Sequence, residues 1–273
     1  RYFKEVHNRS SFDNKGKKVS SIVNMHGLVT QNQKTINLGL NAFFSRVTDQ
    51  MKYGTGDGVL SNFAGALDIA GHELTHGVIN YSSELVYKNQ SGALNESFAD
   101  IFGTMIERKN WRMGEDLNAP DYLRALVERD MDRPWIQGNP GHMNDFLRTT
   151  DDDGGVHTNS GIPNRAYFLL AQGLTDENKG QSVGLAKAEK LAYQTMIGLS
   201  RNDRFIHAAI KMIQVGESLY GTNSAEVAAV KAAWTEVGVY EEEIAEDTED
   251  TVVEPEPVAL ANGDDVLFFL YPR

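Results

Sequence analysis

Residues 64–78 of this 273-residue chain read AGALDIAGHELTHGV, and this stretch decides the fold. Its apolar residues recur at the three- and four-residue spacing of one helix face, at Leu67, Ala70, Leu74 and Val78. Residues 1–60 show no convincing helical period. They hold two short runs typical of strands, residues 19–23 and 36–40, and a turn-rich segment at residues 54–58. We therefore expect the chain to change from strands to helices at the quoted stretch.

The helical period continues along most of the remaining chain. Residues 92–108 repeat it with a largely apolar face, and later helices are expected at residues 160–170, 184–197, 204–220 and 224–237. Helix stop signals lie near the ends of these segments, at Gly173, Gly198 and Gly221. The patterns predict an α+β fold with two lobes. A β-rich lobe over residues 1–80 ends in the quoted helix, and a mainly α-helical lobe follows over residues 81–240.

The last part of the chain differs in composition. Residues 241–257 hold a glutamate run and few apolar residues, which indicates an acidic linker. Residues 258–273 become apolar again at VLFFL, and they are either the start of a further domain or a strand that docks on the body. Of the net charge of −12, residues 241–273 carry −10, which leaves −2 for the body. A nearly neutral body and an acidic tail argue against a nucleic-acid partner.

The composition excludes cysteine chemistry and a membrane-spanning segment. The chain has no cysteine, so disulfides, a thiol nucleophile and a cysteine-ligated zinc are excluded. No apolar run is long enough to span a membrane, and no membrane association is expected.

The quoted stretch also holds a candidate metal site. His72 and His76 are four residues apart, so a helix places both imidazoles on one face, where they can bind one zinc ion. Glu73 follows the first histidine and lies beside the metal, where it can take a proton from a zinc-bound water. The alternative is a pair of surface histidines on an amphipathic helix. A glutamate at this position makes a chance pair much rarer, so the zinc site is favoured.

A catalytic zinc needs a third protein ligand, and the next helix offers one. Glu96 can supply a carboxylate oxygen, and Asp100, four residues on, faces the same way. Ligating imidazoles usually donate their other N–H group to a carboxylate or a carbonyl, a role that fits Asp100. The alternative is a solvated face, but the apolar neighbours of these carboxylates indicate a buried helix, in which a carboxylate needs a metal or a partner.

These motifs resemble those of the thermolysin family of neutral metallopeptidases. Nineteen residues separate His76 from Glu96, within the segments GHELTHG and SGALNES. Further matching segments follow the same order along the chain: NAFF at residues 41–44, KYGTGDG at 52–58, LRAL at 123–126, GGVHTNSGI at 154–162 and residues 226–239. The resemblance covers about residues 1–240. It also implies more β-rich sequence before the point that matches Arg1, so the β-rich lobe is expected to be partly missing here.

The resemblance implies a role for each matching residue of the zinc site. His72, His76 and Glu96 would hold one zinc ion, and Glu73 would act as general base and pass the proton to the leaving amine. The remaining residues would assist these: Tyr87 and His157 would donate to the oxyanion, Asp152 would orient His157, and Asp100 and the carbonyl of Asn95 would orient the ligand histidines.

Substrate-binding residues are also implied by the resemblance. Asn41 and Ala42 would belong to an edge strand that pairs with the substrate backbone, and residues 52–58 would form the loop after it. Arg124 would bind a substrate carbonyl, and Leu123 would be a wall of the apolar pocket. The other histidines, His7, His26, His142 and His207, are interpreted as structural or surface residues.

The family's inner calcium site matches Asp68, Glu107 and Glu115, whose hard oxygen ligands suit Ca²⁺. Asn110 and Arg112 stand where carboxylates are expected in members with two ions at this site, so we expect one structural calcium. The segment of residues 117–123 is shorter than the family's loop that binds another calcium, so no ion is expected there.

The zinc motif and the resemblance together predict a monomeric zinc endopeptidase that acts on peptides and proteins. The resemblance implies that it is secreted and that it cleaves before bulky hydrophobic residues. A related zinc aminopeptidase is one alternative. In such aminopeptidases the gap between the second histidine and the third ligand is typically one residue shorter. Their sequence motif for binding a free amine is not found in this chain. An inactive or truncated zinc-binding fragment is the other alternative, and the presence of Glu73 and His157 argues against it.

Overall fold

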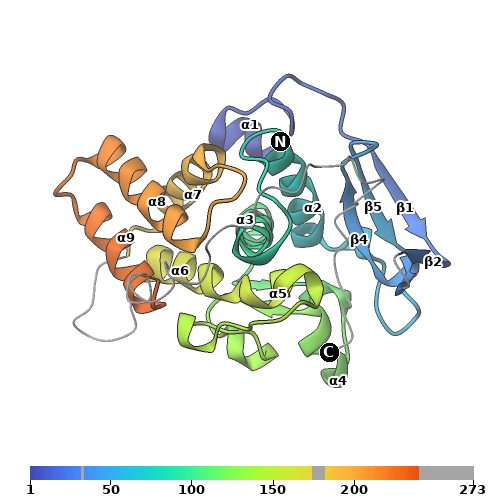
Figure 1. The fold of residues 1–273 in the computed structure, drawn as a ribbon. Helices are drawn as coiled ribbons and strands as arrows, with labels where there is room; N and C mark the ends of the chain where they lie inside the picture. The colour runs from blue at the N-terminus through green and yellow to red at the C-terminus, as the bar shows by residue number, and fades with distance from the viewer. Residues whose placement is uncertain (32–33, 174–181, 240–273) are drawn as a thin grey trace.

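The computed structural model describes residues 1–31, 34–173 and 182–239. A small β-sheet lies at one end of the molecule and a group of helices at the other, with α2 (Leu67–Asn80) and α3 (Asn89–Glu107) between them (Figure 1). The α+β fold with two lobes is therefore confirmed. The expected linker over residues 241–257 and the segment of residues 258–273 lie outside the described residues.

The sheet has the strand order β1-β5-β4, so β4 (Ala42–Ser45) is an edge strand among the described residues. β1 (Ser21–Met25) is parallel to β5 (Gln50–Gly54), and β4 is antiparallel to β5, with Ala42 opposite Tyr53. A separate antiparallel hairpin joins β2 (Leu28–Gln31) and β3 (Lys34–Asn37).

Two expectations for this lobe are wrong in detail. The strand expected at residues 36–40 ends at Asn37, because the Asn37 side chain accepts a hydrogen bond from the Gly39 amide at 3.0 Å and turns the chain into the short 3-10 helix Leu38–Leu40. The loop expected at residues 52–58 begins later, since residues 52–54 still belong to β5.

A helix that the periodicity of residues 1–60 does not reveal opens the chain. α1 (Tyr2–His7) has six residues and only Phe3 is buried, which is too little for a recognisable apolar stripe. Long-range aromatic packing holds it in place. The Phe3 ring lies 5.5 Å from that of Phe102, and the His7 ring stacks at 4.1 Å on Tyr193.

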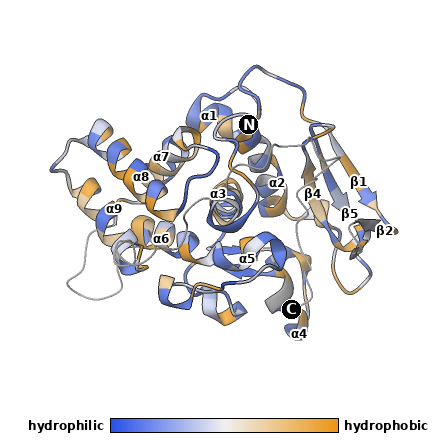
Figure 2. Ribbon diagram, in the orientation of Figure 1, coloured by the Kyte–Doolittle hydropathy of each residue, from blue (hydrophilic) through white to orange (hydrophobic). Residues whose placement is uncertain are grey.

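The long helices of the second lobe lie close to their expected bounds. They are α6 (Gly161–Gln172), α7 (Leu185–Gly198), α8 (Phe205–Tyr220) and α9 (Ala225–Glu236). Figure 2 shows both hydrophobic and hydrophilic faces on α8 and α9. No periodicity in the sequence indicates the shorter elements, which are β6 (Arg112–Met113), α4 (Asp121–Val127), β7 (Arg129–Asp130) and α5 (Asp152–Asn159). Among the described residues, no helix is both long and apolar enough to cross a membrane.

Glycines let α2 and α3 approach at backbone distance. A Cβ on Gly103 would lie 2.6 Å from the backbone oxygen of Asp68, and one on Gly71 would lie 3.1 Å from the Gly103 Cα. On the opposite side of α2, Gly77 leaves room for the Phe44 ring of β4, which would lie 2.8 Å from a Cβ there. These contacts fix α2 between the sheet and α3.

Candidate active site

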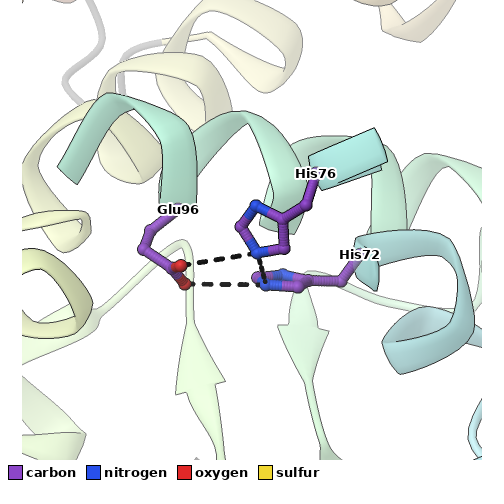
Figure 3. A group of neighbouring side chains, drawn as sticks. All are labelled: His72, His76 and Glu96. Carbon is purple, nitrogen blue, oxygen red and sulfur yellow. Dashed lines mark hydrogen bonds and ion pairs between the residues drawn. The ribbon is translucent and has the colours of Figure 1, made fainter. Parts of the chain in front are cut away.

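Three side chains from α2 and α3 converge in the interior. The Nε2 atoms of His72 and His76 are 2.8 Å apart, and the Glu96 carboxylate lies 3.5 Å from His72 Nε2 and 3.4 Å from His76 Nε2 (Figure 3). His72 and Glu96 are fully buried, and His76 is nearly so. The structure therefore brings together the residues that the sequence predicts as zinc ligands, which form one of its candidate metal-ion groups.

Hydrogen bonds settle the tautomers of both imidazoles. His72 Nδ1 lies 2.9 Å from Asp100 Oδ1, and His76 Nδ1 lies 2.9 Å from Asn95 Oδ1, while the Asn95 amide nitrogen donates to the Leu85 carbonyl. Because these oxygens can only accept, each Nδ1 carries the proton and each Nε2 presents a bare lone pair. The acceptor from Asn95 is its side-chain carbonyl.

This donor set fits a divalent cation. Burial lowers the pKa of His72. Burial, and to a lesser extent the neighbouring His72, lowers the pKa of His76 well below its usual value. Both imidazoles are therefore neutral. Two bare nitrogen lone pairs and a carboxylate then face one another without a proton between them. One oxygen of Glu96, Oε2, is buried and has no hydrogen bond. Two imidazoles and a carboxylate are a ligand set that zinc adopts in catalytic sites.

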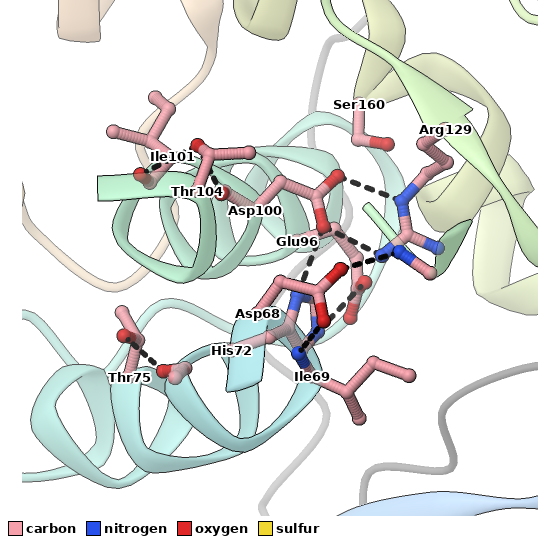
Figure 4. A network of polar contacts seen from close by, with 12 residues as sticks. Asp68, Ile69, His72, Thr75, Glu96, Asp100, Ile101, Thr104, Arg129 and Ser160 are labelled. Carbon is pink, nitrogen blue, oxygen red and sulfur yellow. Dashed lines mark hydrogen bonds and ion pairs between the residues drawn. The ribbon is translucent and has the colours of Figure 1, made fainter. Parts of the chain in front are cut away.

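Asp100 is held by an arginine that the sequence reasoning missed. Arg129 on β7 donates from Nε to Asp100 Oδ2 at 2.7 Å and from Nη2 to Oδ1 at 2.5 Å (Figure 4). Burial alone would raise the pKa of Asp100, but Arg129 and His72 hold it below its usual range. Asp100 is therefore an ionised acceptor for the His72 imidazole.

Glu73 lies in the same buried region. Its side chain is fully buried, and neither carboxylate oxygen has a hydrogen bond. Burial, and after it the charge of Glu96, raises the pKa of Glu73 well above its usual value. A raised pKa makes this carboxylate a stronger proton acceptor than an ordinary glutamate, which is what a general base requires.

Two further polar side chains approach Glu96 from other elements. The Tyr87 hydroxyl donates to Glu96 Oε1 at 2.5 Å and lies 3.1 Å from His157 Nε2, which is itself 3.4 Å from Glu96 Oε2. Asp152 accepts from His157 Nδ1 at 2.7 Å and from the His157 backbone amide at 2.9 Å. Burial lowers the pKa of His157, but Asp152 and Glu96 outweigh it and raise that pKa to about 9. His157 is therefore a cationic donor at neutral pH.

A left-handed turn places Asp152 against His157. The residues from Asp152 to Gly155 have φ angles of 51°, 52°, 93° and 75° in succession. Glycine tolerates this region and aspartate is among the residues that visit it, which explains the local sequence DDGG. Space is limited as well, because a Cβ on Gly154 would lie 2.1 Å from Asn89 Oδ1.

The predicted substrate-binding residues occupy two regions. Asn41 and Ala42 are buried at the start of the edge strand β4, which packs on α2. Arg124 on α4 is not brought to the cluster: its guanidinium contacts Asp121 at 3.1 Å and donates to the Ala119 carbonyl at 3.3 Å. Leu123 is partly buried against the core. Sequence reasoning had no signal that distinguishes Arg129 from Arg124, since only the fold buries one of them.

A second group of carboxylates includes Asp68, which lies on α2 one helical turn before His72. Ligand atoms of Asp68, Glu107 and Glu115 all lie within 4.8 Å of one another. Burial and repulsion between carboxylates raise the pKa of Asp68 to about 6 and that of Glu107 to about 7. Close by, the Asn110 amide donates to Glu115, and Lys109 Nζ lies 2.5 Å from Asp116.

Comparison with protein families gives two matches. The model described as the thermolysin metallopeptidase catalytic domain matches residues 1–80, and the one described as its alpha-helical domain matches residues 83–239. Among solved structures, the precursor of protealysin, a metalloproteinase from Serratia proteamaculans, has a TM-score of 0.70 and 31% identity, and the match covers 87% of this chain and 74% of that one.

Individual relatives agree. An extracellular elastase of Staphylococcus epidermidis is 39% identical over 240 residues, which are 87% of this chain and 44% of the elastase. A thermolysin of Alicyclobacillus acidocaldarius is 39% identical over 252 residues, which are 88% of this chain and 43% of that protein. The chain thus spans less than half the length of these curated relatives. With both family models matched in order along almost all of the described residues, the chain belongs to the thermolysin metallopeptidase family.

Proposed function

We propose that this chain is the catalytic part of a zinc-dependent endopeptidase. The observation that carries the proposal is the convergence of His72, His76 and Glu96 beside the buried Glu73 carboxylate, which has no hydrogen bond. Membership of a metallopeptidase family supports the same reading and implies a catalytic zinc. Zinc bound by these ligands would supply Lewis acidity, which polarises a peptide carbonyl and acidifies water.

The chain's own residues would carry the proton transfers. Glu73 would take the proton from the attacking water and deliver it to the nitrogen of the leaving amine, and its raised pKa supports both steps. Tyr87 and His157 would donate hydrogen bonds to the oxygen on which negative charge develops. Asp152 would keep His157 protonated and oriented, as its two hydrogen bonds to that residue suggest.

The peptide would lie along the edge strand β4, where Asn41 and Ala42 would meet its backbone. An extended peptide can add to a strand edge through main-chain hydrogen bonds. Asn41 and Ala42 are buried here, so binding would require the chain that covers β4 to move aside. Cleavage before bulky hydrophobic residues and secretion are proposed from the family, in which the S. epidermidis relative bears the name extracellular elastase. We also propose that the protein acts as a monomer.

We further propose one structural calcium ion at Asp68, Glu107 and Glu115. Three carboxylates within 4.8 Å of one another repel, and a hard cation would relieve that repulsion. Asn110 and Lys109, which contact Glu115 and Asp116, supply donors where a second ion would need acceptors. A single ion is therefore favoured.

The test is cleavage of peptides blocked at both termini. A chelator should abolish cleavage and added zinc should restore it, and Glu73→Gln should lower kcat by a factor on the order of 10²–10⁴, the usual contribution of a general base. Glu84→Gln is the matched control, because Glu84 is exposed and lies 3.9 Å from Arg201.

Three results would count against the proposal. Cleavage that resists the chelator would exclude a metal-dependent reaction, and full activity of Glu73→Gln would exclude the general base. Cleavage only of peptides with a free amino terminus would favour an aminopeptidase. Peptides that differ only in the residue after the scissile bond would test the preference for leucine or phenylalanine over glycine.

A further inference from the structure

The carboxylate of Asp100 is held by donors from several elements. Oδ1 accepts from His72 Nδ1 at 2.9 Å and from Arg129 Nη2 at 2.5 Å. Oδ2 accepts from Arg129 Nε at 2.7 Å and from Asn164 Nδ2 at 2.8 Å. Asn164 lies on α6, outside the segments that carry the metal ligands, and only 1% of its surface is exposed.

The orientation of the Asn164 amide follows from its partner. An ionised carboxylate can only accept, so the NH₂ group must face Asp100 and the carbonyl must point away. That carbonyl oxygen, Oδ1, is buried and has no hydrogen bond. Leaving a buried acceptor without a partner is unfavourable. An apolar side chain of the same shape would avoid this penalty, so packing alone does not explain asparagine here.

We infer that Asn164 is a positioning residue for the ligand His72, acting through Asp100. Arg129 alone could turn together with the carboxylate, but a donor from a different helix fixes the carboxylate plane. The plane of Asp100 fixes the direction of the His72 imidazole, and this direction aims the bare Nε2 at His76 and Glu96. Groups that orient ligands in this way usually affect metal affinity.

The inference rests on the proposed zinc site, so its test measures zinc binding itself. The full-length chain with Glu73→Gln, which removes self-cleavage, is stripped of metal and titrated with zinc against a chromophoric chelator. Asn164→Leu keeps the side-chain shape but removes both the donor and the unpartnered acceptor. We expect its zinc dissociation constant to rise about tenfold, the lower end of the range for residues that orient ligands. The melting temperature of its metal-free form should change little.

Tyr167→Phe is the matched control. Tyr167 lies on the same helix and is equally buried, and its hydroxyl also has no hydrogen bond. Its zinc affinity should equal that of the parent. Asn164→Ala, which also lacks the donor, serves as a second variant should Asn164→Leu fail to fold.

The outcomes separate this inference from the proposed function. A parent protein that binds no zinc would overturn the proposed function, and this inference with it. A parent that binds zinc, with Asn164 variants within twofold of it, would overturn the inference alone. An equal loss in Tyr167→Phe would also overturn it, since the effect would then come from the packing of α6. A loss of affinity confined to the Asn164 variants would support it.

Discussion

At the residue scale, the candidate site depends on which atoms carry protons. Asp100 and Asn95 accept from the Nδ1 atoms of the two ligand histidines, so the Nε2 atoms are left bare and convergent. A helix with two histidines four residues apart would not suffice if either imidazole took the other tautomer. The sequence motifs predict Asp100 and Asn95 as these acceptors. Only the fold identifies the buried Arg129, which keeps Asp100 ionised.

The left-handed turn before His157 gives a prediction at this scale. Gly154→Ala should lower both the melting temperature and kcat/KM, because its φ of 93° is unfavourable for alanine by ~1–2 kcal/mol and the new Cβ would meet Asn89. Gly221→Ala after α8 is the control, since φ there is 95° but nothing lies within 4 Å of its Cβ position. Equal losses in the two variants would show that displacement of His157 plays no part.

At the scale of elements, the site is an interface between α2 and α3. Two ligands come from α2 and one from α3, so the metal cluster exists only while these helices keep their spacing. Gly71 and Gly103 permit that spacing, because a side chain at either position would meet the other helix. The helical period predicts each helix, but it carries no information about how closely they pack.

We therefore expect Gly103→Ala to damage the site from a distance. Overpacking against the Asp68 carbonyl should cost ~1–3 kcal/mol of unfolding free energy and should weaken zinc binding, measured by chelator competition, because the ligands are forced apart. Gly198→Ala near the end of α7 is the control, with its nearest contact the flexible Lys211 side chain at 3.4 Å. Unchanged zinc affinity in a folded Gly103→Ala protein would contradict this account.

At the scale of the whole molecule, the proposed calcium group links elements of both lobes. Asp68 belongs to α2, Glu107 to the end of α3, and Glu115 to the short 3-10 helix that follows β6. The chain has no disulfide to resist unfolding, since it has no cysteine. A bound ion would stabilise the folded state by mass action.

The raised pKa values of this group predict how stability depends on pH. Asp68 moves from 3.8 to about 6 and Glu107 from 4.5 to about 7, so the folded protein binds more protons than the unfolded chain between about pH 4 and pH 7. Without calcium, stability should fall as the pH rises through this window. With calcium, the melting temperature should recover at pH 8, where the carboxylates are ionised.

Melting curves of Glu73→Gln protein at pH 5 and pH 8, with and without calcium, would check this. Asp68→Asn is the control and should remove most of the calcium effect. A melting temperature at pH 8 that does not change when calcium is added would contradict the proposed calcium site.

The sequence by itself determined the candidate metal-binding side chains and the order of the long helices. The histidine pair, Glu73 and Glu96 follow from spacing on helices, because local periodicity is written in neighbouring residues. The long helices are predicted for the same reason. The division at residues 80 and 81 stays a prediction.

Only the tertiary structure decided which distant residues meet. It selects Arg129 rather than Arg124, brings Asn164 to Asp100, and holds α1 against Phe102 and Tyr193. These contacts join residues that are far apart in the sequence. They depend on burial and on shape, and neither leaves a periodic pattern among neighbouring residues from which it could be predicted.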